Sequence, residues 1–202
     1  MRDDFEIVGF FYETSGHKCR KYLDIKRKKS KQSSPDLMVV MMNPGSSSPL
    51  DKIDNNCMPS VAVPDNTQDQ IMSVMDNCSF DYARIMNLSD LRTPDSKKLY
   101  QFLKSSVSNS FPHSIFNPER RTELDNLFIK GVPLIYGWGV NSILLDLAKL
   151  AVETISHPRP VGIRKVGTTY SYYHPLPRVH KDRVKWVENI SSMLLTEKAR
   201  TI

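Results

Sequence analysis

The chain of 202 residues is 40% hydrophobic and 25% charged, and its 28 basic residues outnumber its 22 acidic residues. This length favours one domain with a full core, and the composition is typical of a folded globular protein rather than a disordered or fibrous one. No run of 18 apolar residues occurs, which excludes a membrane-spanning helix. Met1–Asp4 carries acids and leads into no long apolar segment, so we expect no secretory signal, no membrane partner and a cytoplasmic protein.

Three scattered cysteines offer neither a metal site nor a disulfide framework. Cys19, Cys57 and Cys78 have no metal-ligand spacing, and an odd number of thiols favours a reducing compartment. The sequence therefore predicts no metal and no cofactor, and we expect a monomer.

The basic residues are concentrated near the N-terminus. Eight lysines and arginines against one acid fall between Lys18 and Lys31. Phe5 to Glu13 and Arg20 to Lys26 are typical of two strands joined by a turn, so a basic hairpin is expected over residues 1–31. Such a hairpin favours a polyanionic partner, although a solvated run of charge is an equally good interpretation.

The central feature is the apolar run Leu37–Met42, which is followed by Asn43-Pro44-Gly45 and three serines. Its continuous hydrophobicity predicts a strand buried on both faces, with a polar loop at its carboxyl end. Ligands of open α/β sheets bind beyond the carboxyl ends of the strands, although Asn-Pro-Gly also makes an ordinary turn. The loop over residues 46–66 is long enough to be functional or mobile.

The rest of the chain alternates between strand and helix patterns. Strands are expected at 80–88, 132–136 and 161–173, and helices at 66–76, 96–104, 117–128, 141–154 and 181–195. This alternation predicts a single three-layer α/β/α domain with a mostly parallel central sheet, whose core spans residues 37–195.

Three of the expected strands end in a side chain that is suited to chemistry. These side chains are Asn43, Asn87 and His174. A parallel sheet brings the carboxyl ends of its strands to one edge, so the three should share a cleft although they are far apart in the sequence.

Aromatic residues lead into the loop at His174. Tyr170, Tyr172 and Tyr173 could stack on bases of a nucleic acid. Packing within the sheet is the alternative for the first two.

At these positions the sequence resembles the uracil-DNA glycosylase superfamily. Residues 42–45 (Met-Asn-Pro-Gly) resemble the first motif, Gly-x-Asn-Pro-Gly, of its single-strand-selective monofunctional and mismatch-specific branches. Residues 174–178 (His-Pro-Leu-Pro-Arg) resemble the second motif, His-Pro-Ser-Pro-Arg. Residues 85–87 and 134–139 are similar to two intervening blocks of that family, and all four blocks follow its order over roughly residues 37–186.

The resemblance implies a monofunctional DNA glycosylase, which flips a damaged or modified base out of DNA and hydrolyses its N-glycosidic bond. Asn43 would orient the attacking water, and His174 would stabilise the negative charge of the departing base. Asn87 would read the base edge, and Arg178 would grip a phosphate beside the lesion. The residues expected to bind the substrate are Met42, Pro44, Gly45, Ser46, Asn87 and Tyr173. Those expected to bind DNA are Lys18, Arg20, Lys26, Arg27, Lys28 and Arg178.

Two motif positions depart from the family pattern. Met41 replaces the glycine of the first motif, and Leu176 replaces the serine of the second. Residues 46–66 offer no counterpart for the aromatic ring that stacks on uracil in the family. The base would then be uracil-like or a bulky modified pyrimidine, such as a glucosylated cytosine of phage DNA, with a role in repair or antiviral defence.

The chain also resembles an uncharacterised bacterial domain family, with an Asn-Pro-Ser-like loop, an Asp-x-Thr at residues 65–67 and a final His-Pro-Leu. That resemblance implies no activity. Two other functions therefore stay open: a non-catalytic nucleic-acid-binding module that uses the basic hairpin and the tyrosines, and a nucleoside- or nucleotide-processing enzyme. No lysine lies beside either motif, which argues against a lyase that forms a Schiff base.

Overall fold

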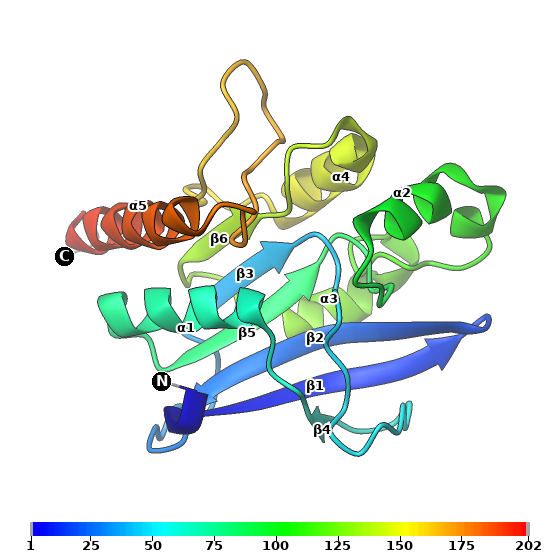
Figure 1. Cartoon of the computed structure of the whole chain (residues 1–202), viewed down its shortest axis with the longest axis horizontal. Coiled ribbons are helices and arrows are strands. Elements are labelled where there is room, and N and C mark those ends of the chain that lie inside the picture. Colours follow the sequence, from blue (N-terminus) through cyan, green and yellow to red (C-terminus); the bar gives the residue numbers. More distant parts are fainter. Residues whose placement is uncertain (1, 201–202) are drawn as a thin grey trace.

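The computed structural model describes residues 2–200 and contains one six-stranded sheet (Figure 1). In the sheet the strands lie in the order β4-β1-β2-β5-β3-β6. The strands are β1 (Phe5–Thr14), β2 (His17–Arg27), β3 (Leu37–Met41), β4 (Ser60–Val61), β5 (Tyr82–Asn87) and β6 (Leu134–Gly137).

The sheet is mixed, and the expectation of a mostly parallel sheet is wrong. β3 is parallel to both β5 and β6, as the alternating pattern of the core predicts. The other three pairings, β4 with β1, β1 with β2, and β2 with β5, are antiparallel. The reason is that the N-terminal hairpin does not stand apart from the core. It joins the sheet by pairing β2 with β5, so the α/β class holds while most of the pairings are antiparallel.

Helices cover both faces of the parallel part of the sheet. They are α1 (Asn66–Cys78), α2 (Ser96–Lys104), α3 (Arg121–Leu127), α4 (Leu145–Ile155) and α5 (His180–Ala199). The side chains of α1 and α5 share one buried cluster, and those of α3 and α4 share another. Figure 1 shows α1 crossing one face of the sheet, with α5 beside it.

Strand β3 lies between the two clusters. Leu37, Val39 and Met41 belong to the cluster of α1 and α5, whereas Met38 and Val40 belong to that of α3 and α4. All five residues are buried, because successive side chains of a strand point to opposite faces and both faces are covered here. This confirms the prediction of a strand that is buried on both faces.

The expected strand at 161–173 is not formed. Only isolated bridges occur there: Val161 pairs with Ile135, and Tyr172 pairs with Gly139 and Arg164. Between Val161 and Tyr172 the chain turns back on itself through Gly167 and forms the loop that projects at the top of Figure 1. The β-rich pattern therefore reflects a folded-back loop.

Helix α1 begins at Asn66, the first residue of the helix expected at 66–76. Asp65 is the N-cap, and its side chain accepts hydrogen bonds from the backbone N–H groups of Thr67 and Gln68. The Oε1 atom of Gln68 in turn accepts a hydrogen bond from the backbone N–H of Asp65, which completes a capping box. Within residues 2–200, none of the helices is sufficiently long and apolar to cross a bilayer.

Candidate functional site

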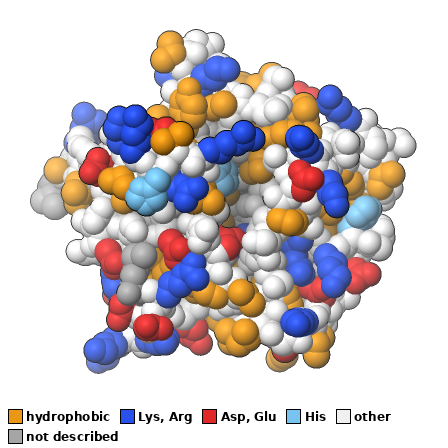
Figure 2. All heavy atoms as spheres, viewed as in Figure 1, with side chains coloured by type: hydrophobic (Ala, Val, Ile, Leu, Met, Phe, Trp, Pro, Cys, Tyr) orange, Lys and Arg blue, Asp and Glu red, His pale blue; other side chains and the backbone are white. Residues whose placement is uncertain are grey.

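A cavity of about 470 Å³ opens at the carboxyl end of β3. Its walls come from the loop after β3, the start of α1, residues 93–94 and the loop at His174. Strand residues Arg20, Met41 and Ile85 line it as well, and they are buried. The face drawn in Figure 2 is hollowed near its centre, with lysine and arginine side chains along the rim of the hollow.

Four of the residues expected from the first motif line this cavity together with Asn43. They are Met42, Pro44, Gly45 and Ser46. Gly45 has a φ of +63°, a backbone conformation that favours glycine, and a Cβ built on it would lie 4.0 Å from Oδ2 of Asp65. The sharp turn after Pro44 thus brings the loop backbone close to the start of α1.

The amide of Asn43 is held in a fixed orientation. Its Nδ2 donates hydrogen bonds to the backbone oxygens of Leu91 and Thr93, at 3.1 and 2.9 Å. These two bonds use both N–H groups of the amide and identify which of its ends is nitrogen. Within residues 2–200 the Oδ1 atom makes no hydrogen bond, so the amide presents an acceptor to the cavity.

The imidazole of His174 is a neutral hydrogen-bond donor. Its Nδ1 accepts a hydrogen bond from the backbone N–H of Leu176 at 3.1 Å, so in the neutral ring the proton is on Nε2. Burial lowers the pKa of His174 to about 4, because the surroundings disfavour the charged ring. At neutral pH the side chain can donate a hydrogen bond without carrying a positive charge.

No strand leads into His174; its position is set by the next residue, Pro175, whose ring packs against the backbone of Gly137. A Cβ built on Gly137, the last residue of β6, would lie 3.1 Å from Cδ of Pro175 and 3.5 Å from Cζ2 of Trp186. The proline ring therefore rests against the end of β6. The bridge between Gly139 and Tyr172 holds the preceding residues at the same end of that strand.

Asn87 lies beneath the cavity rather than in its lining. The residue is fully buried at the end of β5, beside Met41 of β3. Its Oδ1 accepts a hydrogen bond from Nη2 of Arg20 at 2.9 Å, and it is Arg20 that lines the cavity. The amide expected to read the base is thus bound to an arginine that was expected on the DNA-binding surface.

A β-bulge directs Arg20 into the cavity. Between the pairs Gly9–Leu23 and Phe11–Arg20, the two residues Lys21 and Tyr22 oppose the single residue of β1 between Gly9 and Phe11. Paired residues share a face, so Arg20 lies on the same face as Phe11, whose ring belongs to the cluster of α1. Without the extra residue, Arg20 would point to the opposite face, and bulges of this kind commonly redirect side chains at functional sites.

The start of α1 supplies two lining residues whose role the sequence reasoning missed. Asp65 is the one carboxylate among the described residues that line the cavity, and its Oδ2 makes no hydrogen bond within residues 2–200. Gln68 is buried, and its Nε2 has no partner among the described residues. The Asp-x-x-Gln spacing of a capping box could have identified both as the beginning of a helix, but not as cavity residues.

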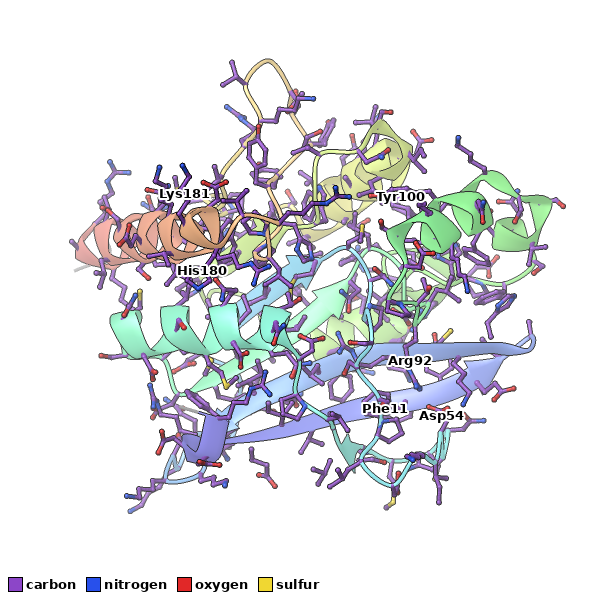
Figure 3. The ribbon with its side chains drawn as sticks, in the orientation of Figure 1. Phe11, Asp54, Arg92, Tyr100, His180 and Lys181 are labelled. Carbon is purple, nitrogen blue, oxygen red and sulfur yellow. The ribbon has the colours of Figure 1, made fainter. Side chains whose placement is uncertain are left out.

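The loop between β3 and β4 is anchored rather than free. Asp54 forms a buried ion pair with Arg92, and Lys18 adds a second contact to Asp54 at 3.4 Å. The guanidinium of Arg92 lies over the ring of Phe11, with 5.1 Å from its central carbon to the ring centroid, as Figure 3 illustrates. The long segment expected to be functional or mobile is thus fastened to the sheet at its middle and contributes both of its ends to the cavity.

The residues expected to bind DNA do not form one surface. Lys26, Arg27 and Lys28 lie where the end of β2 pairs with the start of β5. This end of the strands is opposite to the end that carries the cavity. Arg27 is engaged by Asp76 and Asp81, and Lys18 by Asp54. Arg178 is exposed, two residues beyond Leu176, which lines the cavity.

Of the tyrosines before His174, one packs in the core and another is exposed. Tyr172 is buried and packs edge-on against Tyr136 and Trp138, with centroid distances of 5.3 and 5.2 Å. Tyr173 is 46% exposed and lies outside the cavity lining, beside the loop of His174. Packing is therefore confirmed for Tyr172, while Tyr173 is free to contact a ligand outside the cavity.

The cavity thus contains a fixed acceptor from Asn43, a neutral donor from His174, and two opposite charges from Asp65 and Arg20. Among residues 2–200, no group of three His, Cys, Asp or Glu side chains could hold a metal ion. In the comparisons with known proteins, the chain matches no family model, no curated protein and no solved structure.

Proposed function

We propose that the protein is a monofunctional DNA glycosylase, which hydrolyses the N-glycosidic bond of a flipped damaged or modified base. The observation that carries the proposal is the pairing of Asn43 and His174 in one cavity, the first as a fixed acceptor and the second as a neutral donor. Its volume of about 470 Å³ falls within the roughly 300–1,000 Å³ that small-molecule sites occupy. The resemblance to the uracil-DNA glycosylase superfamily rests on the same two residues, and a three-layer domain of that type belongs to the proposal.

The polarity of the cavity suits this reaction. As the bond between C1′ and the base nitrogen breaks, the electron pair moves to the base and the sugar becomes positively charged. The Nε2–H of His174 would donate to the oxygen on which the negative charge of the base develops. The carboxylate of Asp65 would stabilise the positive sugar electrostatically.

Asn43 would position the water that attacks C1′. An amide oxygen accepts a hydrogen bond from water but is too weak a base to remove its proton, so the chemistry relies on a highly reactive sugar cation. The water oxygen forms the new bond to C1′ and loses a proton to solvent, while the departing base gains one. The described lining contains no lysine, in keeping with hydrolysis rather than Schiff-base formation.

The test is base release from defined DNA. The full-length protein is incubated with single-stranded and duplex oligonucleotides that contain uracil, 5-hydroxymethylcytosine or glucosylated 5-hydroxymethylcytosine, and abasic sites are then cleaved with alkali. We expect cleavage with at least one base and its loss in Asn43→Ala and His174→Ala. The matched control is His180→Ala, because His180 is an exposed histidine outside the cavity lining. An absence of cleavage on every substrate would contradict the proposal.

One observation favours a second candidate, which is hydrolysis of the same bond in a free nucleotide. Lys26, Arg27 and Lys28 lie at the far end of the strands and Lys18 is paired, so these residues form no continuous basic surface around the cavity. The same assay with free deoxynucleotides distinguishes the two. Release of base from nucleotides but not from oligonucleotides would assign the smaller substrate.

A further inference from the structure

Arg20 differs from the other largely buried arginines in having no carboxylate partner. Three such arginines each form a direct ion pair, namely Arg84 with Asp24, Arg92 with Asp54 and Arg120 with Asp90. Arg20 is 2% exposed, and within residues 2–200 it forms no ion pair within 4 Å. Its one side-chain hydrogen bond there is to the neutral amide of Asn87.

Arg20 lines the cavity and has side-chain donors that no described residue uses. Its Nε is buried without an acceptor, and no hydrogen bond among the described residues uses Nη1. A buried charge without an ion-pair partner is costly, and ionisable groups perturbed in this way cluster at functional sites. The carboxylate of Asp65 lines the same cavity without forming an ion pair with Arg20, although its negative charge favours the charged guanidinium.

Two nearby amides have donors without an acceptor. The Nε2 of Gln68 and the Nδ2 of Asn87 are both buried and have no partner among the described residues. Burial lowers the pKa of Arg20 to about 10, which leaves the guanidinium charged at neutral pH. Arg20 and Gln68, which both line the cavity, therefore each have a donor without an acceptor, and Asp65 is the one carboxylate of the described lining.

We infer that Arg20 determines specificity by binding an anionic group of the ligand, and that the substrate is a nucleotide unit whose base carries an acidic substituent or whose phosphate reaches this position. The inference rests on the proposed function only for the statement that the ligand is a nucleotide unit. Arg20 and Gln68 together offer donors to two oxygens of a carboxylate or phosphate, which is the geometry that a guanidinium recognises best. In a flipped nucleotide held by Asn43 and His174, the part of the base that is furthest from the sugar would face Arg20.

Binding measurements test this inference without any turnover. The full chain is titrated by calorimetry at pH 7.5 with 2′-deoxyuridine, with 5-carboxy-2′-deoxyuridine and with deoxyuridine monophosphate. We expect one of the two anionic ligands to bind about 10- to 100-fold more tightly than the neutral nucleoside. A preference for the carboxylated nucleoside assigns the anion to the base, and a preference for the monophosphate assigns it to the phosphate. Equal affinity for all three ligands overturns the inference.

Two variants ask whether Arg20 is responsible. Arg20→Met removes the charge, and Asn87→Asp supplies a carboxylate that would pair with the guanidinium. We expect both to bind the anionic and neutral ligands within about twofold of each other. Persistence of the preference in both variants would overturn the inference.

Stability distinguishes a ligand-binding role of Arg20 from a structural one. Replacing a buried arginine that has no carboxylate partner should leave the melting temperature close to that of the wild type, or raise it. The matched control, Arg84→Met, leaves Asp24 without its guanidinium and should lower it clearly. A larger loss of melting temperature in Arg20→Met than in Arg84→Met would make Arg20 a structural residue and overturn the inference.

The binding measurements and the glycosylase assay can fail independently of each other. Arg20-dependent binding of an anionic ligand without base release would contradict the proposed function and leave the inference standing. Release of a neutral base without any preference for anionic ligands would do the reverse.

Discussion

The backbone N–H of Leu176 donates a hydrogen bond to Nδ1 of His174, and this single contact fixes the tautomer of the imidazole. The two residues belong to the same loop, so the donor that faces the cavity is set by local geometry. Because burial also lowers the pKa of His174 to about 4, the ring is uncharged across the physiological range.

The pH dependence of activity should reflect this low pKa. A histidine with an ordinary pKa near 6.5 would become charged as the pH falls from 7 to 6. We expect the acid limb of the rate of base release to lie near pH 4, with little change between pH 5 and pH 8. Single-turnover rates across this range, together with circular dichroism to check folding, provide the measurement. An acid limb centred near pH 6.5 in the folded wild type would contradict the assignment.

The same residue affects stability in a defined direction. The unfolded chain binds a proton at His174 below about pH 6.5, whereas the folded chain does so only near pH 4. Protonation of the unfolded state therefore favours unfolding as the pH falls from 6.5 to 4. His113, whose pKa burial also lowers to about 4, adds to this effect. Urea unfolding at pH 7 and pH 5 should show a lower free energy of unfolding at pH 5, and a smaller difference in the double variant His113→Gln, His174→Gln.

Asn43→Asp should lower the free energy of unfolding more than so small a change in side-chain size suggests. The substitution removes both N–H donors and sets a carboxylate against the carbonyl oxygens of Leu91 and Thr93. We expect the free energy of unfolding to fall by about 2–4 kcal/mol. Denaturant unfolding measures this, and an Asp variant as stable as the wild type would show that the amide is not held by these two carbonyls.

Asn43→Ala separates the role of the side chain in stability from its role in the reaction. It removes the same donors without placing a charge there, so it should be more stable than the Asp variant. Loss of the acceptor for water should reduce the single-turnover rate by about 100- to 1,000-fold.

Gly137→Ala should displace His174 and lower the rate of base release, although Gly137 is not in the cavity lining. Its new methyl group would lie 3.1 Å from the ring of Pro175, so the proline and the adjacent His174 must shift. We expect the rate of base release to fall about tenfold, because small displacements of a catalytic group are costly. If the contact with Pro175 is the cause, the rate loss in the double variant Gly137→Ala, Pro175→Ala should be less than the product of the two single losses. Independent, multiplicative effects would place the cause elsewhere.

DNA affinity should depend on Arg178 and not on Lys28. Both side chains are exposed, but Lys28 lies beyond the start of β5, about 20 Å from the end of that strand at its rise of about 3.3 Å per residue. This separation exceeds the Debye length of about 10 Å at 0.1 M salt. Arg178→Glu should weaken binding to an oligonucleotide about tenfold, and the matched charge reversal Lys28→Glu by less than twofold. Equal effects would restore the N-terminal hairpin as the DNA-binding surface.

Much of the fold can be predicted from local pattern. The apolar run at 37–42 yields a strand buried on both faces, and the helix expected at 96–104 has the bounds Ser96–Lys104. Asn117 followed by Pro118 begins a helical segment in the expected order of cap and proline. The placement of Asn43 and His174 in one cavity agrees with the reasoning from strand ends, even though no strand precedes His174.

What could not be predicted depends on non-local pairing. The direction in which β2 joins β5 is set by tertiary packing, so the mixed sheet does not follow from the alternation of helices and strands. The bulge at Lys21 and Tyr22 moves Arg20 from one face to the other, and a shift of one residue leaves no trace in composition or charge. For the same reason, the sequence predicts Asn87 at the end of a strand but not the hydrogen bond that its Oδ1 accepts from Arg20.

The most direct test of the proposed chemistry is detection of the released base itself. DNA that contains uracil, 5-hydroxymethylcytosine and glucosylated 5-hydroxymethylcytosine is incubated with the full-length protein, and the small-molecule fraction is analysed by mass spectrometry. The proposal predicts that one free base appears in amounts equal to the abasic sites formed, that Asn43→Ala lowers this amount at least about 100-fold and His174→Ala abolishes it, and that His180→Ala leaves it unchanged. Strand cleavage without free base, or base release that survives both cavity variants, would contradict it.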